Sequence, residues 1–538
     1  MRLPTRLPGQ PSEASRLPLT IDVHTHVFNG SDLQIKEFIS QAVVGQEDAE
    51  LYQLARVMGG VLQGLAWRKA PSARDELRAL ERYVTQVRRE PATAPQVSAR
   101  PAYQEGYARG RQALQQAAAA VETSPDAAVL GPASGLPGAG LGAAIRDLPP
   151  THEAFEDTRQ EPGTVLGSQP HLQGYIRFVL HHFNYRFVNA IDYLTTYAKD
   201  PSRHVDLMLA SLVDYDWWLA RGRAPDTPLM QQVEVMHRIC VLLDGRVHGF
   251  APFCPFRETM TSRRGADGDS MRLVKHAVAE RGFLGVKLYP PMGFAPYGNA
   301  ALRVWQNKKS LPSAAADPAF GQRLDTAMRR LFEWCLANEV PIMAHANHSN
   351  GPYEEFKTLA GAEYWERALA AFPGLKVSFG HLGDTDIEDH DGERSRSYIG
   401  LMSAVPGSRG ANVFADSSYF AGVLGRPRAV VEVLDRLLRE SQDGVLASRL
   451  MYGSDWTMVL PQRNVDQYLT EFAGVLREID NRRELRAPGS GVSNAFFGGN
   501  ARTFLGLGKG TAARQRLESF YGRNRLAQPQ WLVKADSQ

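Results

Sequence analysis

Two histidines near the start of the chain are the residues best suited to chemistry. His24 and His26 stand two positions apart in the apolar run IDVHTH at residues 21–26. Side chains two apart on a β-strand point to the same side, so a strand here would present both imidazoles to one point. Neutral imidazole is a common ligand of divalent transition metals. The pair therefore predicts half of a metal site, provided that other ligands reach the same place.

Four later segments share one design, a short apolar run that ends in or near a side chain suited to a reactive site. Their sequences are GVKLYP, PIMAH, KVSFGH and LMYGSD, and the side chains concerned are Lys287, His345, His381 and Asp455. Each run is bounded by Gly, Pro or a loop, as the buried strands of parallel sheets are. Between these runs, apolar residues recur at helical spacing over 320–338, 353–372 and 426–440.

Strands that alternate with helices predict βαβ units and a parallel sheet. We expect eight strands, at about 21–27, 204–213, 247–254, 284–290, 341–347, 375–381, 411–417 and 449–455. Eight is the number that a closed (β/α)8 barrel needs, and such a barrel carries its active site at the C-terminal ends of its strands. The fold prediction is therefore an α/β TIM barrel whose polar strand ends converge at one mouth.

The order of the polar strand ends resembles the ligand order of the amidohydrolase superfamily. That order is HxH on the first strand, Lys on the fourth, His on the fifth and sixth, and Asp on the eighth. The endings DVHTH, VSFGHLGD and MYGSDW, and the stretch 494–507, are most similar to the branch called amidohydrolase family 2. That branch holds both hydrolases and non-oxidative decarboxylases. The resemblance covers about 20–30 and 200–507 and leaves out 31–170.

The resemblance implies a site for one or two divalent ions, and zinc is the expected metal. Imidazole nitrogen and carboxylate oxygen suit such an ion, and a catalytic site leaves one position open for water. His24, His26 and Asp455 would hold one ion, and His345 and His381 would complete a second.

Lys287 stands where similar strands of the dihydroorotase type carry a carbamylated lysine. An ammonium cannot bind a metal, but the oxygens of a carbamate can bridge two ions. Burial in an apolar strand disfavours the ammonium and makes the neutral amine available to carbon dioxide. The alternative is that Lys287 stays an ammonium, which forms a salt bridge or binds a substrate carboxylate beside a single ion.

The predicted activity is that of a metal-dependent hydrolase that uses activated water to cleave a C–N or C–O bond in a small carbonyl substrate. Asp455 would move the proton from water to the leaving group, and His345 and His381 are the other catalytic candidates. The first alternative is a zinc-dependent non-oxidative decarboxylase of a small carboxylic acid, in which His345 or Asp455 would deliver the proton. The second is a catalytically silent barrel used as an interaction module, which is disfavoured because no ligand position has been lost.

Three further residues are candidates for binding the substrate. Arg257 follows the third strand and could hold a substrate carboxylate, although a surface ion pair fits it equally well. Tyr289 and Asn347 lie two residues beyond Lys287 and His345, on the same strand faces, so we expect them to point towards the mouth. Asp416 ends the seventh strand and is a weaker candidate for a residue that supports a ligand.

Composition fits a soluble enzyme of the cytoplasm. The net charge is only +3 over 538 residues and no basic stripe is visible, so we expect a small-molecule substrate rather than nucleic acid. Three widely spaced cysteines indicate reduced thiols. No apolar run reaches the length of a membrane span, and the N-terminal segment lacks an apolar signal core.

The chain is longer than a plain barrel, so it must contain further segments. We expect a barrel made of 19–30 and 199–507, and a helical insertion at 31–198 that forms a lid or an interface in a homo-oligomer. Residues 91–170 are rich in Pro, Ala, Gly and Ser, which predicts a disordered linker within the insertion. Residues 1–18 are expected to form a flexible arm and 508–538 a tail.

Overall fold

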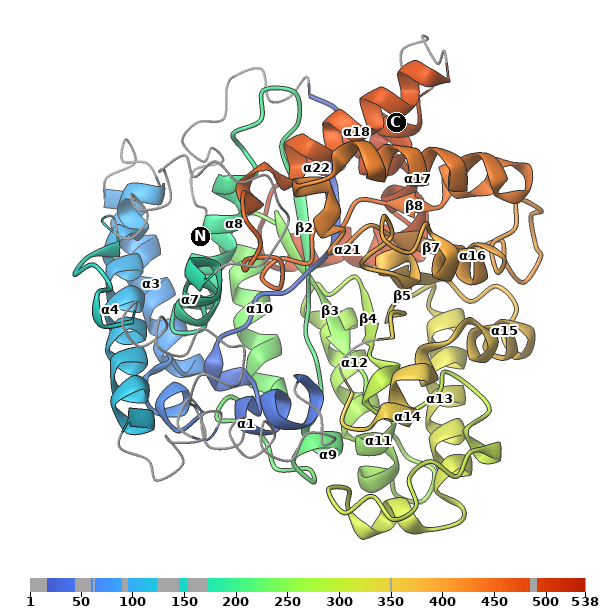
Figure 1. Cartoon of the computed structure of the whole chain (residues 1–538), viewed down its shortest axis with the longest axis horizontal. Helices are drawn as coiled ribbons and strands as arrows, with labels where there is room; N and C mark the ends of the chain where they lie inside the picture. The colour runs from blue at the N-terminus through green and yellow to red at the C-terminus, as the bar shows by residue number, and fades with distance from the viewer. Residues whose placement is uncertain are drawn as a thin grey trace.

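The protein folds around a central barrel, with a group of helices from its N-terminal part standing beside it. The computed structural model describes residues 17–43, 60, 63–89, 95–122, 145–152, 154, 172–348, 351–483 and 491–537. Figure 1 shows the strands in the middle of the molecule and helices α3 and α4 at its left edge. None of the described helices combines the length and the apolar composition that crossing a bilayer requires.

Eight parallel strands form the barrel, as the sequence predicts. They are β1 (Ile21–Thr25), β2 (Leu207–Ser211), β3 (Val247–Pro252), β4 (Gly285–Leu288), β5 (Ile342–His345), β6 (Val377–Gly380), β7 (Val413–Asp416) and β8 (Leu450–Met451). Each strand pairs with the next one in the chain. The barrel closes where the end of β8 meets β1: Val23 N donates to Tyr452 O at 3.1 Å, and Asp455 N donates to His24 O at 2.8 Å. The fold is a TIM barrel.

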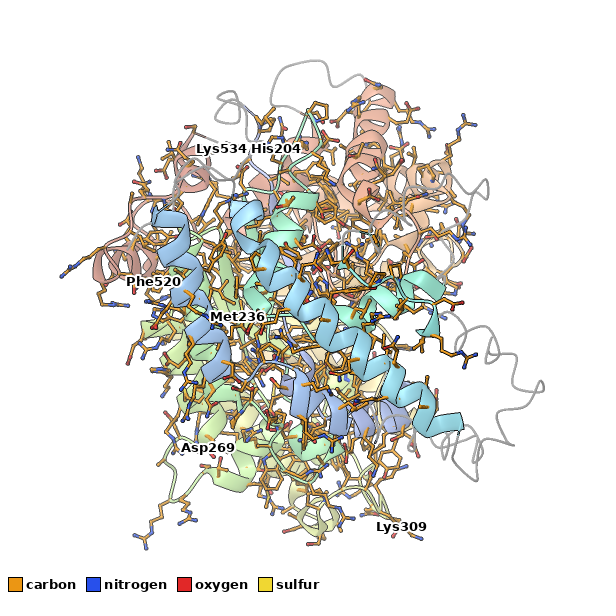
Figure 2. The ribbon with its side chains drawn as sticks, turned by 90° about the vertical axis from the view of Figure 1, so that its left-hand side faces the viewer. His204, Met236, Asp269, Lys309, Phe520 and Lys534 are labelled. Carbon is orange, nitrogen blue, oxygen red and sulfur yellow. The ribbon has the colours of Figure 1, made fainter. Side chains whose placement is uncertain are left out.

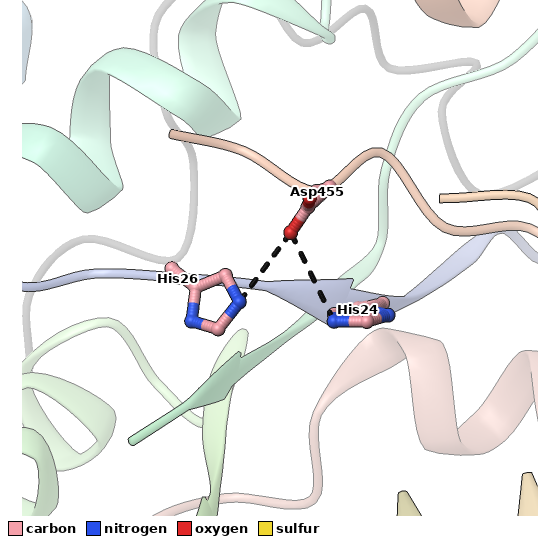
Figure 3. A group of neighbouring side chains, drawn as sticks. All are labelled: His24, His26 and Asp455. Atoms are coloured by element: carbon pink, nitrogen blue, oxygen red, sulfur yellow. Dashed lines mark ion pairs between the residues drawn. The ribbon is translucent and has the colours of Figure 1, made fainter. Parts of the chain in front are cut away.

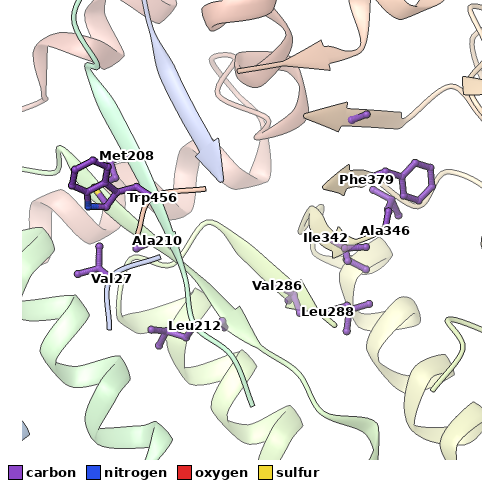
Figure 4. Close-up of a cluster of buried hydrophobic side chains, with 14 of the residues drawn as sticks. Val27, Met208, Ala210, Leu212, Val286, Leu288, Ile342, Ala346, Phe379 and Trp456 are labelled. Atoms are coloured by element: carbon purple, nitrogen blue, oxygen red, sulfur yellow. The ribbon is translucent and has the colours of Figure 1, made fainter. Parts of the chain in front are cut away.

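Alternation along the strands separates two apolar layers, because successive side chains point to opposite faces. On β4, Val286 and Leu288 belong to the layer shared with the surrounding helices, so Lys287 between them points to the barrel centre. Figure 4 shows part of this outer layer. The inner layer at the opposite end of the barrel includes Phe250 and Phe414, whose rings pack against Phe504.

Helices cover the outside of the barrel between consecutive strands. They include α9 (Asp216–Leu219), α10 (Leu229–Leu242), α11 (Pro255–Thr261), α12 (Asp269–Glu280), α13 (Phe320–Ala337), α14 (Glu354–Lys357), α15 (Ala362–Ala371), α16 (Glu393–Ile399), α17 (Pro427–Glu440) and α18 (Tyr468–Arg482). The helices expected at 320–338 and 426–440 are confirmed as α13 and α17. The stretch expected at 353–372 is broken between α14 and α15, at a 3-10 turn over Thr358–Ala360.

The C-terminal part of the chain closes the end of the barrel opposite the mouth. It contains α19 (Val492–Asn494), α20 (Asn500–Phe504), α21 (Ala512–Arg523) and α22 (Gln530–Asp536). Leu517, Phe520 and Trp531 of the last two helices share a buried cluster with Ile21 of β1. The indole of Trp531 also donates to Gly245 O at 2.8 Å, just before β3 begins. The expected tail therefore packs against the barrel as two short helices.

The insertion between β1 and β2 is helical where the structure describes it. It contains α1 (Ile35–Glu37), a π-helical segment (Phe38–Val43), α3 (Ala73–Arg89), α4 (Pro95–Glu122), α7 (Leu172–His181) and α8 (Arg186–Thr196). In the side view of Figure 2, the long helix α4 lies across the front of the molecule. The expected flexible arm falls largely on residues 1–16, which lie outside the described residues.

The predicted disordered linker at 91–170 is wrong for Pro95–Glu122, which form α4. Alanine is the strongest helix former, and small side chains let two helices approach closely. A Cβ on Gly110 would lie 2.8 Å from Leu180 Cδ2, and Ala113 is fully buried. Tyr107 is also buried and donates through its hydroxyl to Pro149 O at 2.7 Å. Residues 91–94, 123–144, 153 and 155–170 of the expected linker lie outside the described residues.

Buried polar contacts hold the insertion together and attach it to the barrel. The Arg186 guanidinium at the start of α8 is fully buried and binds both Asp32 and Glu76, the latter with Nη1 to Oε2 at 2.5 Å. Tyr193 donates to Asp22 Oδ2 of β1 at 2.5 Å, and Tyr197 donates to the backbone after β8. These contacts hold α8 against the first strand, next to the two histidines.

Candidate metal centre at the barrel mouth

Three predicted ligands converge at the closing edge of the barrel. His24 and His26 come from β1 and its end, and Asp455 comes from the turn that follows β8. One ligand atom from each lies within 4.8 Å of the other two, and all three side chains are buried. Asp455 Oδ1 stands 3.4 Å from His26 Nε2 and 3.8 Å from His24 Nε2 (Figure 3).

The atoms of this group fit a divalent cation. Asp455 Oδ1 is buried and makes no hydrogen bond of good geometry, and its nearest polar neighbour is His26 Nε2 at 3.4 Å. Burial alone would raise the pKa of Asp455, but the hydrogen bond from His26 and the neighbouring histidines hold it below its usual value. An ionised, under-coordinated carboxylate oxygen facing two imidazole nitrogens is a donor set that zinc and similar ions accept.

Lys287 reaches the same group from the opposite side of the barrel. Its Nζ lies 2.6 Å from His24 Nε2, and the side chain is almost completely buried. Burial lowers the pKa of Lys287 to about 8, so the neutral amine is more accessible near neutral pH than in an ordinary lysine. The structure thus places the lysine where the sequence predicts it, at the barrel centre beside His24.

His345 and His381 stand beside the three-ligand group rather than within it. His381 Nε2 lies 3.2 Å from His345 Nδ1, and the His381 and His24 rings are 5.1 Å apart. Burial, followed by the nearby His381, lowers the pKa of His345 well below its usual value, which keeps this imidazole neutral. A neutral imidazole is the form that binds a metal or accepts a proton.

Two of these residues adopt a left-handed backbone conformation. His381 has φ 63° and Asp455 has φ 59°. Such values cost free energy for residues with a Cβ and persist only where the surroundings fix them. Asp416 accepts from His381 N at 3.1 Å, and His24 O accepts from Asp455 N at 2.8 Å. Hydrogen bonds within the site therefore hold both strained residues in place.

Asp416 and Ser418 complete the site, and sequence reasoning gave them too little weight. Asp416 lies 3.2 Å from His24 Nδ1, and Ser418 Oγ lies 2.9 Å from the same atom. Burial would raise the pKa of Asp416, but the neighbouring His24 ring and its hydrogen bond to the carboxylate hold this pKa well below its usual value. The end of the seventh strand signalled Asp416 only weakly, and no pattern in the sequence marked Ser418.

Two glycines make room for the His24 ring. A Cβ on Gly380 would lie 2.9 Å from His24 Cε1, and one on Gly453 would lie 3.1 Å from His24 Cβ and 3.1 Å from Ser418 Cβ. These approaches are closer than real Cβ contacts normally are. A larger residue is therefore disfavoured at both positions because a side chain would collide with its neighbours, and not because the backbone has a positive φ. The sequence offers them as the G of SFGH and of MYGSD.

The predicted substrate-binding residues reach the mouth in different ways. Arg257 binds Asp214, with Nε to Oδ2 at 2.6 Å, and Asp216 at 2.5 Å. Of the two roles expected for Arg257, the structure therefore shows the ion pair, and this ion pair is partly buried. Tyr289 stacks on His345 with ring centroids 4.2 Å apart. Asn347 donates to Thr385 Oγ1 at 3.2 Å, while its own side-chain oxygen is buried without a hydrogen-bond partner.

Aromatic residues that the sequence analysis did not select also border the site. Tyr215 meets Tyr289 edge to face at 5.2 Å, and burial raises the pKa of its hydroxyl well above the usual value. Phe28 lies between His26 and His182, the residue that follows α7. One wall of the mouth therefore comes from the insertion.

Residues 254–507, from α11 to the end of α20, match the model of a family described as amidohydrolase. The matched part contains β4 to β8 and four of the six predicted ligands, whereas β1 with His24 and His26 lies outside it. No curated protein matches the chain.

Several solved structures resemble the chain at low identity. An amidohydrolase from Burkholderia multivorans with bound zinc is 14% identical, with 56% of this chain and 84% of that chain covered at a TM-score of 0.32. A protein from Lactobacillus casei, provisionally named a metal-dependent hydrolase, is 12% identical over 92% of this chain and 96% of that chain, with a TM-score of 0.38. The 5-carboxyvanillate decarboxylase of Novosphingobium aromaticivorans with bound manganese is 13% identical over 66% of this chain and 94% of that chain, with a TM-score of 0.31.

At these identities and TM-scores, the likeness says nothing about the substrate or the reaction of this protein. The family match rests instead on the sequence of residues 254–507, which carry Lys287, His345, His381 and Asp455. The similarity to the amidohydrolase family is thus shown for residues 254–507, which contain β4 to β8.

Proposed function

We propose that the protein is a metal-dependent hydrolase that cleaves a C–N or C–O bond in a small carbonyl substrate. The observation that carries this proposal is the position of Lys287, whose Nζ lies 2.6 Å from His24 Nε2 in the group formed with His26 and Asp455. A lysine buried there supports hydrolase activity, because its amine can be converted into a carbamate, an anionic ligand that would lie between two ions.

The carbamate forms when the neutral Nζ adds to the carbon of carbon dioxide and releases one proton to solvent. The lowered pKa of Lys287, about 8, makes the reactive amine available. His24, His26 and Asp455 would then hold one ion, and His345 and His381 would belong to the second. A divalent ion in this site, with zinc expected, would supply a Lewis acid that activates water and polarises a carbonyl group.

The chain's own residues then have distinct roles. The Asp455 carboxylate takes the proton from the attacking water and returns it to the leaving group. His345 and His381 would hold the ion whose positive charge stabilises the developing charge on the substrate oxygen. Tyr289 and Asn347 orient the substrate at the mouth, and Arg257, whose charge Asp214 and Asp216 already compensate, shapes its rim.

A non-oxidative decarboxylase is the second candidate, and one observation favours it. Among the described residues, the only group of three ligand atoms close enough for one ion is His24, His26 and Asp455. A site with a single ion would leave Lys287 as a plain lysine and His345 free to deliver a proton to the carbon that loses carbon dioxide.

The number of ions per chain separates the two candidates. We expect elemental analysis of the purified protein to find two divalent ions per chain, and the double variant His24→Ala, His26→Ala to lose most of the metal with an unchanged circular dichroism spectrum. The control is His276→Ala, which removes a histidine that pairs with Glu234 away from the mouth.

Activity should be screened on small amides, lactones and esters, and on carboxylic acids with detection of carbon dioxide. Lys287→Ala should lose one ion and hydrolysis, and a short-chain acid such as propionate should restore part of both. Unchanged metal content in the double histidine variant would refute the metal site. One ion per chain together with release of carbon dioxide would refute hydrolysis in favour of decarboxylation.

A further inference from the structure

We infer that Asp416 and Ser418 form one positioning unit that sets the tautomers of two metal-site histidines, His24 from β1 and His381 from the end of β6. The inference deepens the proposed function, because it rests on these histidines being ligands. It concerns the hydrogen bonds behind the site, on the side of the rings that faces away from the three-ligand group.

The Ser418 hydroxyl has three partners. Its Oγ lies 2.9 Å from His24 Nδ1, 2.9 Å from His381 Nδ1 and 2.5 Å from Asp416 Oδ1. A hydroxyl offers one proton and two lone pairs. One donated and two accepted hydrogen bonds therefore use its full capacity, and they join rings from two strands that are not neighbours in the sheet.

The direction of each hydrogen bond follows from Asp416. Its carboxylate receives the backbone N–H groups of His381 at 3.1 Å and Ser418 at 3.0 Å, so it acts as an acceptor throughout. The Ser418 hydroxyl must donate to it, and this leaves the Ser418 oxygen to accept from both rings. His24 Nδ1 also faces Asp416 directly, at 3.2 and 3.3 Å, and His381 Nδ1 faces Ser418 O at 2.9 Å.

Both histidines therefore carry their proton on Nδ1 and keep a lone pair on Nε2. The His24 lone pair points at Lys287 Nζ and Asp455, and the His381 lone pair points at His345 Nδ1. A metal ligand needs this lone pair, and a carboxylate behind a histidine is a recurrent way to secure it. One short turn thus prepares two ligands at once.

The turn is built rigidly. Asp416 and Ser418 have no exposed surface, and Gly453 packs within 3.4 Å of both, measured from the Cβ that it lacks. The same carboxylate holds the backbone of His381 in its left-handed conformation. Asp416 and Ser418 therefore fix the ring orientations and tautomers of His24 and His381, and Asp416 also fixes the backbone conformation of His381.

Asp416→Asn tests the anchor, because the amide can turn an N–H towards His24 Nδ1. We expect the His24 proton to move to Nε2, visible in long-range proton–nitrogen spectra of protein labelled with ¹⁵N-histidine at pH 8. Metal affinity should fall by about 10- to 100-fold. Ser418→Ala should weaken affinity by about tenfold, and the double variant should bind no more weakly than Asp416→Asn alone, because Ser418 acts through Asp416.

The matched control is Ser378→Ala, which removes a buried hydroxyl of β6 that has no hydrogen-bond partner and should change affinity less than about twofold. Additive losses in the double variant, or a His24 proton on Nε2 in the unaltered protein, would overturn the inference. If Asp416→Asn does not fold, the metal affinities of Ser418→Ala and Ser378→Ala are compared instead. Equal affinities of these two variants would overturn the inference. If the unaltered protein binds no metal, the proposed function fails, and the spectra alone confirm or overturn the tautomers.

Discussion

Replacing Arg186 by methionine should loosen the packing of α8 against α3 and against the start of the insertion. The guanidinium is fully buried, and Nε donates to Asp32 Oδ2 at 2.7 Å while Nη2 donates to Ser31 Oγ at 3.1 Å. Glu76 completes the triad and also accepts from Phe187 N at 2.8 Å. Methionine keeps an unbranched stem but leaves two buried carboxylates without their cation.

The expected loss is large because the charges are buried. Removing one partner of a buried ion pair typically costs about 3–5 kcal/mol, since the remaining charge stays desolvated. At about 1.4 kcal/mol for each factor of ten, this corresponds to roughly two to three and a half orders of magnitude in the population of the opened state. Burial already raises the pKa of Glu76, so one carboxyl can take up a proton and limit the loss to the lower end of this range.

Hydrogen exchange followed by mass spectrometry measures the opening directly. In Arg186→Met, amides of α8 and α3 should exchange faster by the stated factor, while α13 on the far side of the barrel should not change. The control is Arg426→Met: Arg426 also binds two carboxylates, Glu388 and Asp389, but its side chain is 47% exposed. Exposed pairs contribute about 0–1 kcal/mol. Equal effects in the two variants would refute the reasoning.

Two further predictions concern regions away from the mouth. Burial lowers the pKa of His248 to about 4, so between pH 6.5 and 4 the unfolded chain protonates this ring while the folded protein keeps it neutral. The contribution of His248 to the free energy of unfolding is therefore complete above pH 6.5 and should be lost as the pH falls towards 4. Urea unfolding should show a shallower pH slope in this window for His248→Phe, and identical slopes would contradict the assignment. Gly110→Leu should expose α4 to limited proteolysis because of the contact with Leu180, whereas Gly522→Leu, with open space around it, should leave digestion unchanged; protection of α4 in both variants would show that close packing is not what holds it.

The barrel could be predicted because its signals are local and repeated. The alternation of Val286, Lys287 and Leu288 fixes which side chain faces the centre, and the same pattern recurs on strand after strand. Ligand positions at the strand ends follow from the architecture. Of the predicted ligands, the structure brings His24, His26, Lys287 and Asp455 together and leaves His345 and His381 adjacent.

What the sequence could not predict depends on partners distant in the chain. Helix α4 has a composition typical of a linker, and only its contact with Leu180 of α7 explains why Gly110 belongs in a packed helix. Arg257 is suited to binding an anion until Asp214 and Asp216 are seen to occupy it. Ser418 gains its importance solely from two rings on other strands.

The three-ligand group straddles the seam at which the barrel closes. His24 and His26 stand on one side of this seam and Asp455 on the other, joined there by a few backbone hydrogen bonds and a single bridge between Thr25 and Trp456. An ion that binds all three side chains spans the first and last strands, so its binding free energy adds to that of ring closure. Such an ion would hold the barrel closed. Its removal by a chelator should first weaken the pairing of β1 with β8, and the unfolding of all the strands between them should become less cooperative.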